Sequence, residues 1–383
     1  MIQPLDATEE IRDAYLRYLR SSYPFQRADL RQKFHEEVSK PNALVKGPLL
    51  ESTPPFRTGA SIGDLVEEGV LHSSFEQLCS EALPYRRPLY LHQEEAIRKS
   101  VSENRNLVIA TGTGSGKTEA FLTPLFDHLL REVEDGTLST PGVRALLLYP
   151  MNALANDQLS RLRSILEEAP FQITFGRYTG ETAYDREDAI RNFKAQFRGE
   201  PIIENELLCR NKMREDPPHI LVTNYAMLEY LLLRPEDHIF FDNDDNTWES
   251  LVLDEAHTYD GATGIELGML IRRLKERIQA PSLSCMATSA TIGEGRKDFP
   301  AVAEFATSLS GEPFEWKAGD DERQDVVAAT RHDTDETEKT WGKGAASLYE
   351  ELHEVLAATE QPDVPARGDG NVPDIDASEW VSG

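Results

Sequence analysis

The stretch NLVIATGTGSGKT, residues 106–118, decides the fold of this chain. A short apolar run enters a glycine-rich turn, and the pattern after Thr118 is helical. Glycines let such a turn point its N–H groups at phosphate oxygens, and the following helix presents its positive dipole end there. Lys117 can then reach the β- and γ-phosphates of a nucleotide, and the Thr118 hydroxyl can ligate Mg²⁺. The predicted phosphate-binding residues are Thr111, Gly112, Thr113, Gly114, Ser115, Gly116, Lys117 and Thr118.

The segment LVLDEAH, residues 251–257, supplies the second half of the predicted nucleotide site. We expect Asp254 to hold Mg²⁺ and Glu255 to orient and deprotonate the attacking water, with Lys117 as the third catalytic residue. Neighbouring residues of a strand point to opposite faces, so both carboxylates can serve only where the strand ends and the chain turns. Alone, the segment could be an ordinary acidic strand end. Its pairing with the phosphate-binding turn favours a catalytic role.

Short apolar runs alternate with amphipathic stretches over residues 89–317. This alternation predicts an α/β fold with a mostly parallel sheet and helices on both faces, whose ligands bind at the carboxyl ends of the strands. The predicted strands are 107–110, 145–149, 173–178, 220–223, 251–253, 286–289 and 314–317, and the main helices are 119–133, 154–168, 265–278 and 301–309.

The chain divides into three predicted regions. Residues 1–85 form a mainly helical N-terminal region, with helices expected at 6–20 and 27–38. Residues 86–320 form the nucleotide-binding domain, in which the charged segment 181–216 interrupts the alternation and is predicted to be an insertion. Residues 321–383 are an acidic, partly disordered tail with one helix, and we expect them to begin a second domain.

The composition is that of a soluble globular protein, with 39% hydrophobic residues and no apolar run of the ~20 residues that span a bilayer. The N-terminus is acidic, unlike a signal peptide, so we predict a cytoplasmic protein without a membrane segment. The three cysteines are widely separated and predict neither a zinc site nor a disulfide framework.

The net charge of −27 argues against a broad basic surface for nucleic acid. Two explanations reconcile this charge with nucleic-acid binding. The carboxylates could cover a solvated face, as in proteins adapted to high salt, whose acid-rich composition this chain resembles. A strand could also be held by backbone amides, short polar side chains and helix N-termini, which need no net positive charge.

Seven segments between residues 90 and 291 resemble, in family order, the motifs of the DEAD/DEAH-box superfamily 2 helicases. The resemblance implies a RecA-like P-loop NTPase domain, a three-layer sandwich that binds ATP and Mg²⁺. The segments are YLHQ (90–93, the Q motif), TGTGSGKT (111–118), YPMNALANDQ (149–158, motif Ia), YTG (178–180), LVTNYAML (221–228), DEAH (254–257) and SAT (289–291, motif III).

The resemblance assigns further roles residue by residue. Gln93 would contact adenine, while His257, Ser289 and Thr291 would couple hydrolysis to movement. The candidates for contacting the nucleic acid are Asn152, Thr179, Gly180, Thr223 and Asn224. The segment 149–158 differs from the P-T-R-E-L form of RNA-unwinding DEAD-box proteins and looks like that of the YprA-like DNA helicases. This implies DNA as the substrate, in repair or anti-phage defence.

Helicases of this family place ATP between two RecA-like domains, and the second domain contributes a Q-x-x-G-R-x-x-R segment. No segment after Thr291 matches it. Since such an arginine contributes ~10³ or more in turnover, we expect the chain to bind Mg-ATP and hydrolyse it slowly. A second RecA-like domain, in cis or in trans, would complete the site, and without it the chain should not unwind nucleic acid.

Two functions from different classes remain open on the sequence. One is a helicase domain or split-helicase subunit, and the other is an ATP-gated binding or scaffold subunit of a repair or defence complex. A P-loop kinase or metabolic ATPase is disfavoured, since it needs none of the Q-like, Ia-like or Ser-Ala-Thr segments.

Overall fold

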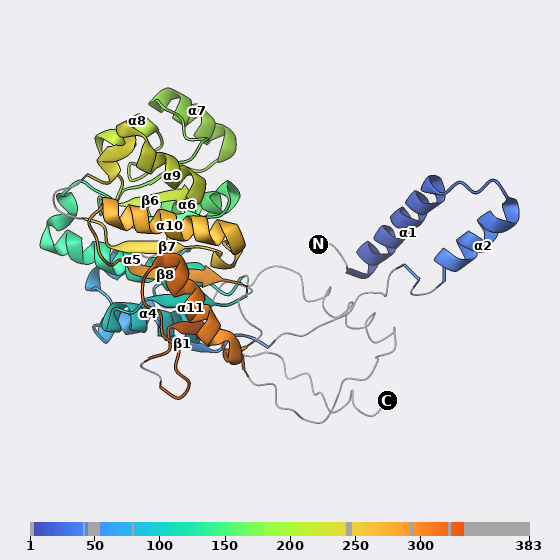
Figure 1. Ribbon diagram of the computed structural model, residues 1–383, viewed down its shortest axis with the longest axis horizontal. Coiled ribbons are helices and arrows are strands. Elements are labelled where there is room, and N and C mark those ends of the chain that lie inside the picture. Colours follow the sequence, from blue (N-terminus) through green and yellow to red (C-terminus); the bar gives the residue numbers. More distant parts are fainter. Residues whose placement is uncertain are drawn as a thin grey trace, which may run out of the picture. The chain divides into compact units, whose positions relative to one another are not determined.

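Seven parallel strands in the order β5-β6-β4-β7-β8-β3-β9 form the central sheet (Figure 1). The structure is a computed structural model that describes residues 4–40, 43–44, 54–78, 80–112, 114–242, 247–290, 295–320 and 323–332. The strands are β3 (Leu107–Ala110), β4 (Ala145–Tyr149), β5 (Phe175–Arg177), β6 (Ile220–Asn224), β7 (Ser250–Leu253), β8 (Ser284–Ser289) and β9 (Val326–Ala328).

The inner strands are apolar on both faces because helices cover both. All five residues of β4 and all four of β7 are buried, which explains their nearly continuous hydrophobic sequences. One core cluster joins the sheet to α4 (Leu91–Glu103), α5 (Lys117–Asp135) and α6 (Asn152–Leu166). The other joins it to α9 (Tyr225–Leu233), α10 (Gly261–Arg277) and α11 (Phe299–Ser310). The predicted three-layer α/β sandwich is confirmed.

The region before the sheet is mainly helical, as predicted. It contains α1 (Pro4–Ser22), α2 (Ala28–Val38), α3 (Ile62–Glu67) and the 3₁₀ helix η1 (Ser73–Leu78). A small antiparallel sheet of β1 (Thr58–Ser61) and β2 (Pro88–Tyr90) was not expected. The remaining elements are α7 (Arg186–Gln196), α8 (Arg210–Glu215), η2 (Thr137–Ser139), η3 (Pro235–Phe240), η4 (Ala256–Thr258) and η5 (Arg296–Asp298).

Two expectations at the end of the sheet are wrong. Residues 314–317 form no strand, and only Trp316 makes an isolated bridge, to Gln324. The last strand is β9, which pairs with β3 beyond the predicted boundary at residue 320. A run of three apolar residues in an acidic stretch is too short to stand out in the sequence. Its burial comes from the neighbouring strand, and Asp325 beside it bonds Arg105 at 2.6 Å. The helix predicted in the C-terminal tail lies outside the described residues.

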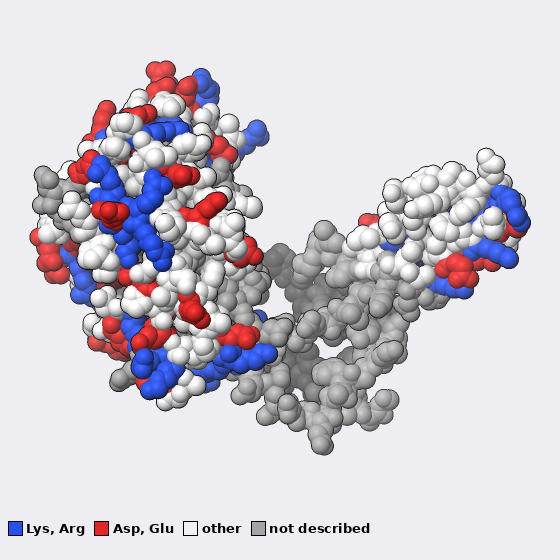
Figure 2. Space-filling model, in the orientation of Figure 1, with Lys and Arg blue, Asp and Glu red and all other residues white. Residues whose placement is uncertain are grey.

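Acidic and basic side chains are interspersed over the face of the sandwich shown in Figure 2. A blue group lies over α10, whose cations are largely engaged within the protein. Arg272 donates to the carbonyls of Gly268 and Ser308, and Lys275 bonds Glu312. These contacts hold α10 against the end of α11. None of the described helices combines the length and the apolar composition that crossing a membrane requires.

His219 precedes β6 and is held as a neutral ring. Its Nδ1 accepts a hydrogen bond from the Thr174 N–H at 2.9 Å, and its Nε2–H donates to the Leu138 carbonyl at 3.1 Å. A proton on Nδ1 would face another donor. Burial, followed by the charge of Arg144, lowers the pKa of His219 from 6.5 to about 4.

This lowered pKa predicts an acid-sensitive fold. As pH falls, the unfolded chain takes up the His219 proton first, so stability is complete above pH 6.5 and is lost toward pH 4. We expect this residue alone to cost about 2 kcal/mol of unfolding free energy between pH 8 and pH 5. Urea unfolding at each pH, compared with His219→Gln, measures the difference. The same pH dependence in both proteins would contradict the assignment.

Candidate active site

The glycine-rich turn after β3 is closed by its own hydroxyls. Ser115 Oγ donates to the Gly112 carbonyl at 2.7 Å and lies 2.6 Å from Thr111 Oγ1. Gly114 and Gly116 have φ of 75° and 74°, in the left-handed region that favours glycine. The turn therefore has the glycine-dependent backbone that a phosphate cradle needs, and it leads directly into α5. Thr113 lies outside the described residues.

Helix α4 supports this turn from behind. His92 Nε2 donates to the Ser115 carbonyl at 2.8 Å, and Gln93 Nε2 donates to the Gly116 carbonyl at 2.8 Å. A Cβ on Gly116 would stand 2.2 Å from Gln93 Nε2, so the contact also requires glycine there. Gln93 Oε1 accepts from the Tyr90 N–H at 2.7 Å. Both ends of the Gln93 amide are thus bonded within the protein, and its contact with adenine remains a prediction.

The three predicted catalytic side chains lie together at the carboxyl edge of the sheet. Lys117 Nζ is 3.1 Å from Glu255 Oε1, although 138 residues separate them in sequence. Asp254 accepts a short hydrogen bond from the Thr288 hydroxyl, and the same hydroxyl accepts from the Glu255 N–H at 3.1 Å. Thr288 therefore fixes both carboxylate residues to β8.

The turn expected at the two carboxylates is present. Strand β7 ends at Leu253, and Glu255 has φ 48° and ψ 47°, a left-handed conformation that is uncommon for a non-glycine residue. This turn brings the Glu255 side chain to Lys117. Such strain at a candidate catalytic residue is consistent with a functional constraint.

The environment of Asp254 sets its electrostatics. Burial raises its pKa, and the charge of Glu255 adds to this, while the Thr288 hydrogen bond and Lys117 act in the opposite direction. Glu255 Oε2 is buried and makes no hydrogen bond to any described residue, and His257 Nδ1 is 3.4 Å away. The site therefore concentrates two carboxylates around one lysine. Such an arrangement suits an additional cation.

The chemistry of the donors fits Mg²⁺. Mg²⁺ takes oxygen ligands and is commonly held by one or two carboxylates together with substrate phosphates. Asp254 supplies a carboxylate, and Thr118 supplies a hydroxyl oxygen at the start of α5. The buried, unbonded Oε2 of Glu255 adds a second negatively charged oxygen at the same edge.

The predicted coupling residues are partly brought together. Ser289 Oγ lies 3.1 Å from His257 Nδ1, which connects the end of β8 to the turn after β7. The Thr111 N–H donates to the Ser289 carbonyl at 3.0 Å, so β8 also contacts the start of the glycine-rich turn. Thr291 lies outside the described residues.

The residues predicted to contact nucleic acid differ in their exposure. Thr179 and Thr223 are each 1% exposed, and the Thr223 hydroxyl donates to the Tyr178 carbonyl at 2.6 Å. In this structure both side chains pack at the turn after β5, and their contact with a nucleic-acid strand remains a prediction. Asn224 caps α9 through the Met227 N–H at 2.8 Å. Gly180 is exposed. Asn152 is the first residue of α6, and its side chain is not among the parts that the structure describes.

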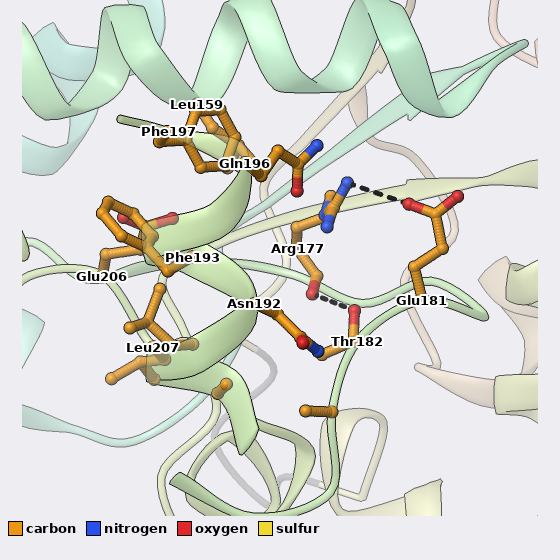
Figure 3. Close-up of a pocket in the computed structure, with 13 residues that line it drawn as sticks. Leu159, Arg177, Glu181, Thr182, Asn192, Phe193, Gln196, Phe197, Glu206 and Leu207 are labelled. Atoms are coloured by element: carbon orange, nitrogen blue, oxygen red, sulfur yellow. Dashed lines mark hydrogen bonds and ion pairs between the residues drawn. The ribbon is translucent and has the colours of Figure 1, made fainter. Parts of the chain in front are cut away.

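The segment 181–216 lies against α6. Arg163 on α6 is 2% exposed, bonds Glu206 at 2.6 Å and lies 4.1 Å from the Phe197 ring centre. Figure 3 shows the pocket beside α7, where Arg177 faces Glu181 at 3.5 Å and its carbonyl accepts from Thr182. This pocket contains none of the predicted ATP-site residues.

Sequence reasoning missed several residues of the site. Thr288 precedes the Ser-Ala-Thr segment, and its position one residue before the end of the buried strand β8 gave no separate signal. Glu119 is buried beside the turn, where it meets Arg161 at 3.2 Å and Gln93 at 3.4 Å. Gln158 donates to the Thr118 hydroxyl at 3.2 Å, although it had been grouped with the strand-contacting motif.

Comparison with known proteins identifies the class. A sequence model described as DEAD/DEAH box helicase matches residues 90–299, more than half of the chain. The chain belongs to this family of ATP-dependent helicases. Its seven-strand sheet and its site geometry agree with this assignment.

Two known relatives are similar to this chain in sequence. The chain is 30% identical to the Druantia protein DruE of Escherichia coli (strain UMEA 4076-1), over 80% of this chain and 21% of that protein. It is also 30% identical to the ATP-dependent helicase YprA of Bacillus subtilis (strain 168), over 59% of this chain and 25% of YprA. The chain thus spans about a quarter or less of these two relatives.

A solved structure of a DUF1998 helicase, MrfA bound to DNA, is similar with a TM-score of 0.50 and 25% identity. The match covers 72% of this chain and 29% of MrfA.

The position of Thr288 yields a test of the site. Thr288→Val keeps the shape but leaves the buried Asp254 carboxylate and the Glu255 N–H without their shared partner. We expect a loss of about 1–3 kcal/mol in unfolding free energy, together with weaker ATP hydrolysis. Thr288→Ser retains the hydroxyl and is the control. If valine and serine behaved alike in urea unfolding and hydrolysis, the bridging role would be wrong.

Proposed function

We propose that the chain is the ATP-binding, first RecA-like domain of a DNA helicase or translocase. The observation that carries the proposal is the contact of Lys117 with Glu255 at 3.1 Å, beside an Asp254 carboxylate held by Thr288. These groups meet where the glycine-rich turn can present phosphates to them. The membership of the DEAD/DEAH box helicase family and the likeness to YprA and to DNA-bound MrfA support the same reading.

Lys117 and Glu255 neutralise each other before a nucleotide arrives. Phosphate oxygens compete with Glu255 for the Lys117 ammonium. When Lys117 pairs with the β- and γ-phosphates instead, the Glu255 carboxylate is released. Glu255 then accepts a proton from the attacking water as general base. The ion pair therefore keeps the base engaged until ATP is in place.

Thr118 and Asp254 are the residues that would hold Mg²⁺. When bound, the metal neutralises charge on the phosphates and on the transferring phosphoryl group. Thr288 orients the Asp254 carboxylate for this role, and the following residue, Ser289, lies against His257. A displacement of Asp254 would thus be passed along β8 to the segment that couples hydrolysis to movement.

We further propose that full turnover requires a second RecA-like domain, in cis or in trans. Its arginines would stabilise charge on the transferring phosphoryl group, worth ~10³ or more in rate. DNA is the proposed substrate because the segment YPMNALANDQ resembles that of YprA-like DNA helicases. The domain alone would then bind ATP and turn it over slowly.

Glu255→Gln tests the proposed base. We expect the variant to bind ATP at least as tightly, since the charge that competes for Lys117 is removed, and to lose at least about 100-fold in hydrolysis. The hydrolysis rate is measured with and without single-stranded DNA, in low and in molar salt, because the chain is strongly acidic. Glu266→Gln, an exposed position on α10, is the matched control.

The outcomes separate the alternatives. If the wild type hydrolyses ATP slowly and Glu255→Gln hydrolyses it more slowly still, the result supports an ATPase domain that needs a second RecA-like domain for full turnover. Strong DNA-stimulated turnover by the chain alone would contradict the need for another domain. Tight ATP binding with equal rates in wild type and Glu255→Gln would instead favour an ATP-gated binding or scaffold subunit.

A further inference from the structure

Two residues of the segment YPMNALANDQ lie at the ATP site. This segment, residues 149–158, resembles a strand-contacting motif, yet its first residue ends the strand beside β7 and its last residue contacts Thr118. Gln158 Nε2 donates to the Thr118 hydroxyl at 3.2 Å. Tyr149 ends β4, the strand next to β7, which leads into Asp254.

The strand register places Tyr149 beside Asp254. Leu148 of β4 pairs with Leu253 of β7, and the Asp254 N–H donates to the Leu148 carbonyl at 3.0 Å. Tyr149 and Asp254 are therefore the next neighbours along the two strands. Side chains alternate between faces, and Leu147 and Tyr149 belong to the core cluster on the α5 side, as does Val252 two residues before Asp254. Directly paired side chains on one face have Cβ atoms about 5 Å apart.

Thr288 occupies the equivalent place on the other side. It donates to Asp254 from β8, the strand that pairs with β7 opposite β4. Asp254 thus lies between Thr288 and Tyr149. Of these two neighbours, Thr288 makes a hydrogen bond to the Asp254 carboxylate. The Tyr149 side chain is fully buried.

Two polar atoms in this region lack a partner. The Tyr149 hydroxyl and Gln158 Oε1 are both buried and make no hydrogen bond to any described residue. The tyrosine hydroxyl can donate or accept a hydrogen bond, whereas the amide oxygen only accepts. Leaving such groups unpaired is unfavourable, and native proteins normally satisfy them with protein groups or with ordered water. Both atoms lie on the side of the sheet where Thr118 and Asp254 would hold a metal.

We propose that Tyr149 and Gln158 are positioning residues of the ATP site. Gln158 orients the Thr118 hydroxyl as a metal ligand, and Tyr149 together with Gln158 Oε1 holds the water that surrounds the metal beside Asp254. This inference rests on the proposed function. The segment 149–158 would then have two roles. Asn152, the first residue of α6, is a candidate contact for a nucleic-acid strand, and Gln158, less than two turns later, contacts Thr118.

The chemistry explains why these side chains are suited to the task. An amide that donates to the Thr118 oxygen leaves that oxygen a free lone pair and turns the hydroxyl proton away from the metal. Partners of this kind fix the orientation of metal ligands, and their removal typically lowers metal affinity by about 10–100-fold. A phenol hydroxyl is a donor that phenylalanine lacks, with nearly the same ring volume.

The test measures nucleotide binding against Mg²⁺ concentration in the full chain, using a fluorescent ATP analogue. We expect Gln158→Leu to raise the Mg²⁺ concentration for half-maximal binding about tenfold, and Tyr149→Phe to raise it about fivefold. Binding of the analogue in EDTA should be unchanged in both variants. Gln196→Leu on α7 and Tyr230→Phe at an exposed position on α9 are the control variants, and both should titrate as the wild type does.

Urea unfolding without nucleotide supplies an independent readout. The Tyr149 hydroxyl has no partner in the described structure, so Tyr149→Phe should leave the midpoint unchanged or raise it. A lowered midpoint would mean that the hydroxyl serves the fold, and an unaltered Mg²⁺ requirement in both variants would overturn the inference while the ATP site stands. A wild-type chain that binds no ATP would instead refute the proposed function itself.

Discussion

The parallel pairing of β7, β8 and β3 is the constraint on which the site depends. It aligns the carboxyl ends of three strands that lie far apart in sequence, Leu107–Ala110, Ser250–Leu253 and Ser284–Ser289. The glycine-rich turn follows the first, the two carboxylates follow the second, and Thr288 lies in the third. Without this register, Lys117 could not meet Glu255 across 138 residues. The apolar burial of both faces holds the register, because a slip would expose the inner strands.

At this edge of the sheet, each charged side chain of the site has a partner within the protein. Lys117 bonds the carboxylate that would act as base, while Asp254 is buried and held by a hydroxyl. A burial that raises the pKa of Asp254 is the cost of keeping a carboxylate ready for a cation. On α10, Arg272 and Lys275 are engaged locally with carbonyls and with the Glu312 carboxylate.

Helix α6 connects the functional regions of the domain. Its first turn carries the candidate strand contact Asn152, Gln158 reaches Thr118, and Arg163 anchors the segment 181–216 through Glu206 and Phe197. A rigid helix with these three attachments would transmit a shift at one to the others. The contact of Ser289 with His257 joins the end of β8 to the turn after β7.

The sequence by itself determined the fold class and identified the candidate residues of an ATP site. The alternation of apolar runs with amphipathic stretches predicts the parallel sheet, and the residue types of 111–118 and 254–255 carry their chemistry in local order. These signals are local, since periodicity and turn composition act within about 15 residues. The strand β9 escaped prediction because its three residues gain their burial only from pairing with β3.

Only the tertiary structure decided which side chains meet. It buries Thr179 and Thr223, which the family resemblance makes candidates for contacting nucleic acid, and it directs Gln158 to Thr118 and Thr288 to Asp254. It also commits the amide of Gln93 to the glycine-rich turn. The physical reason is that contacts across parallel strands depend on strand order and register, which are set by packing over the whole domain and leave no local trace in the sequence.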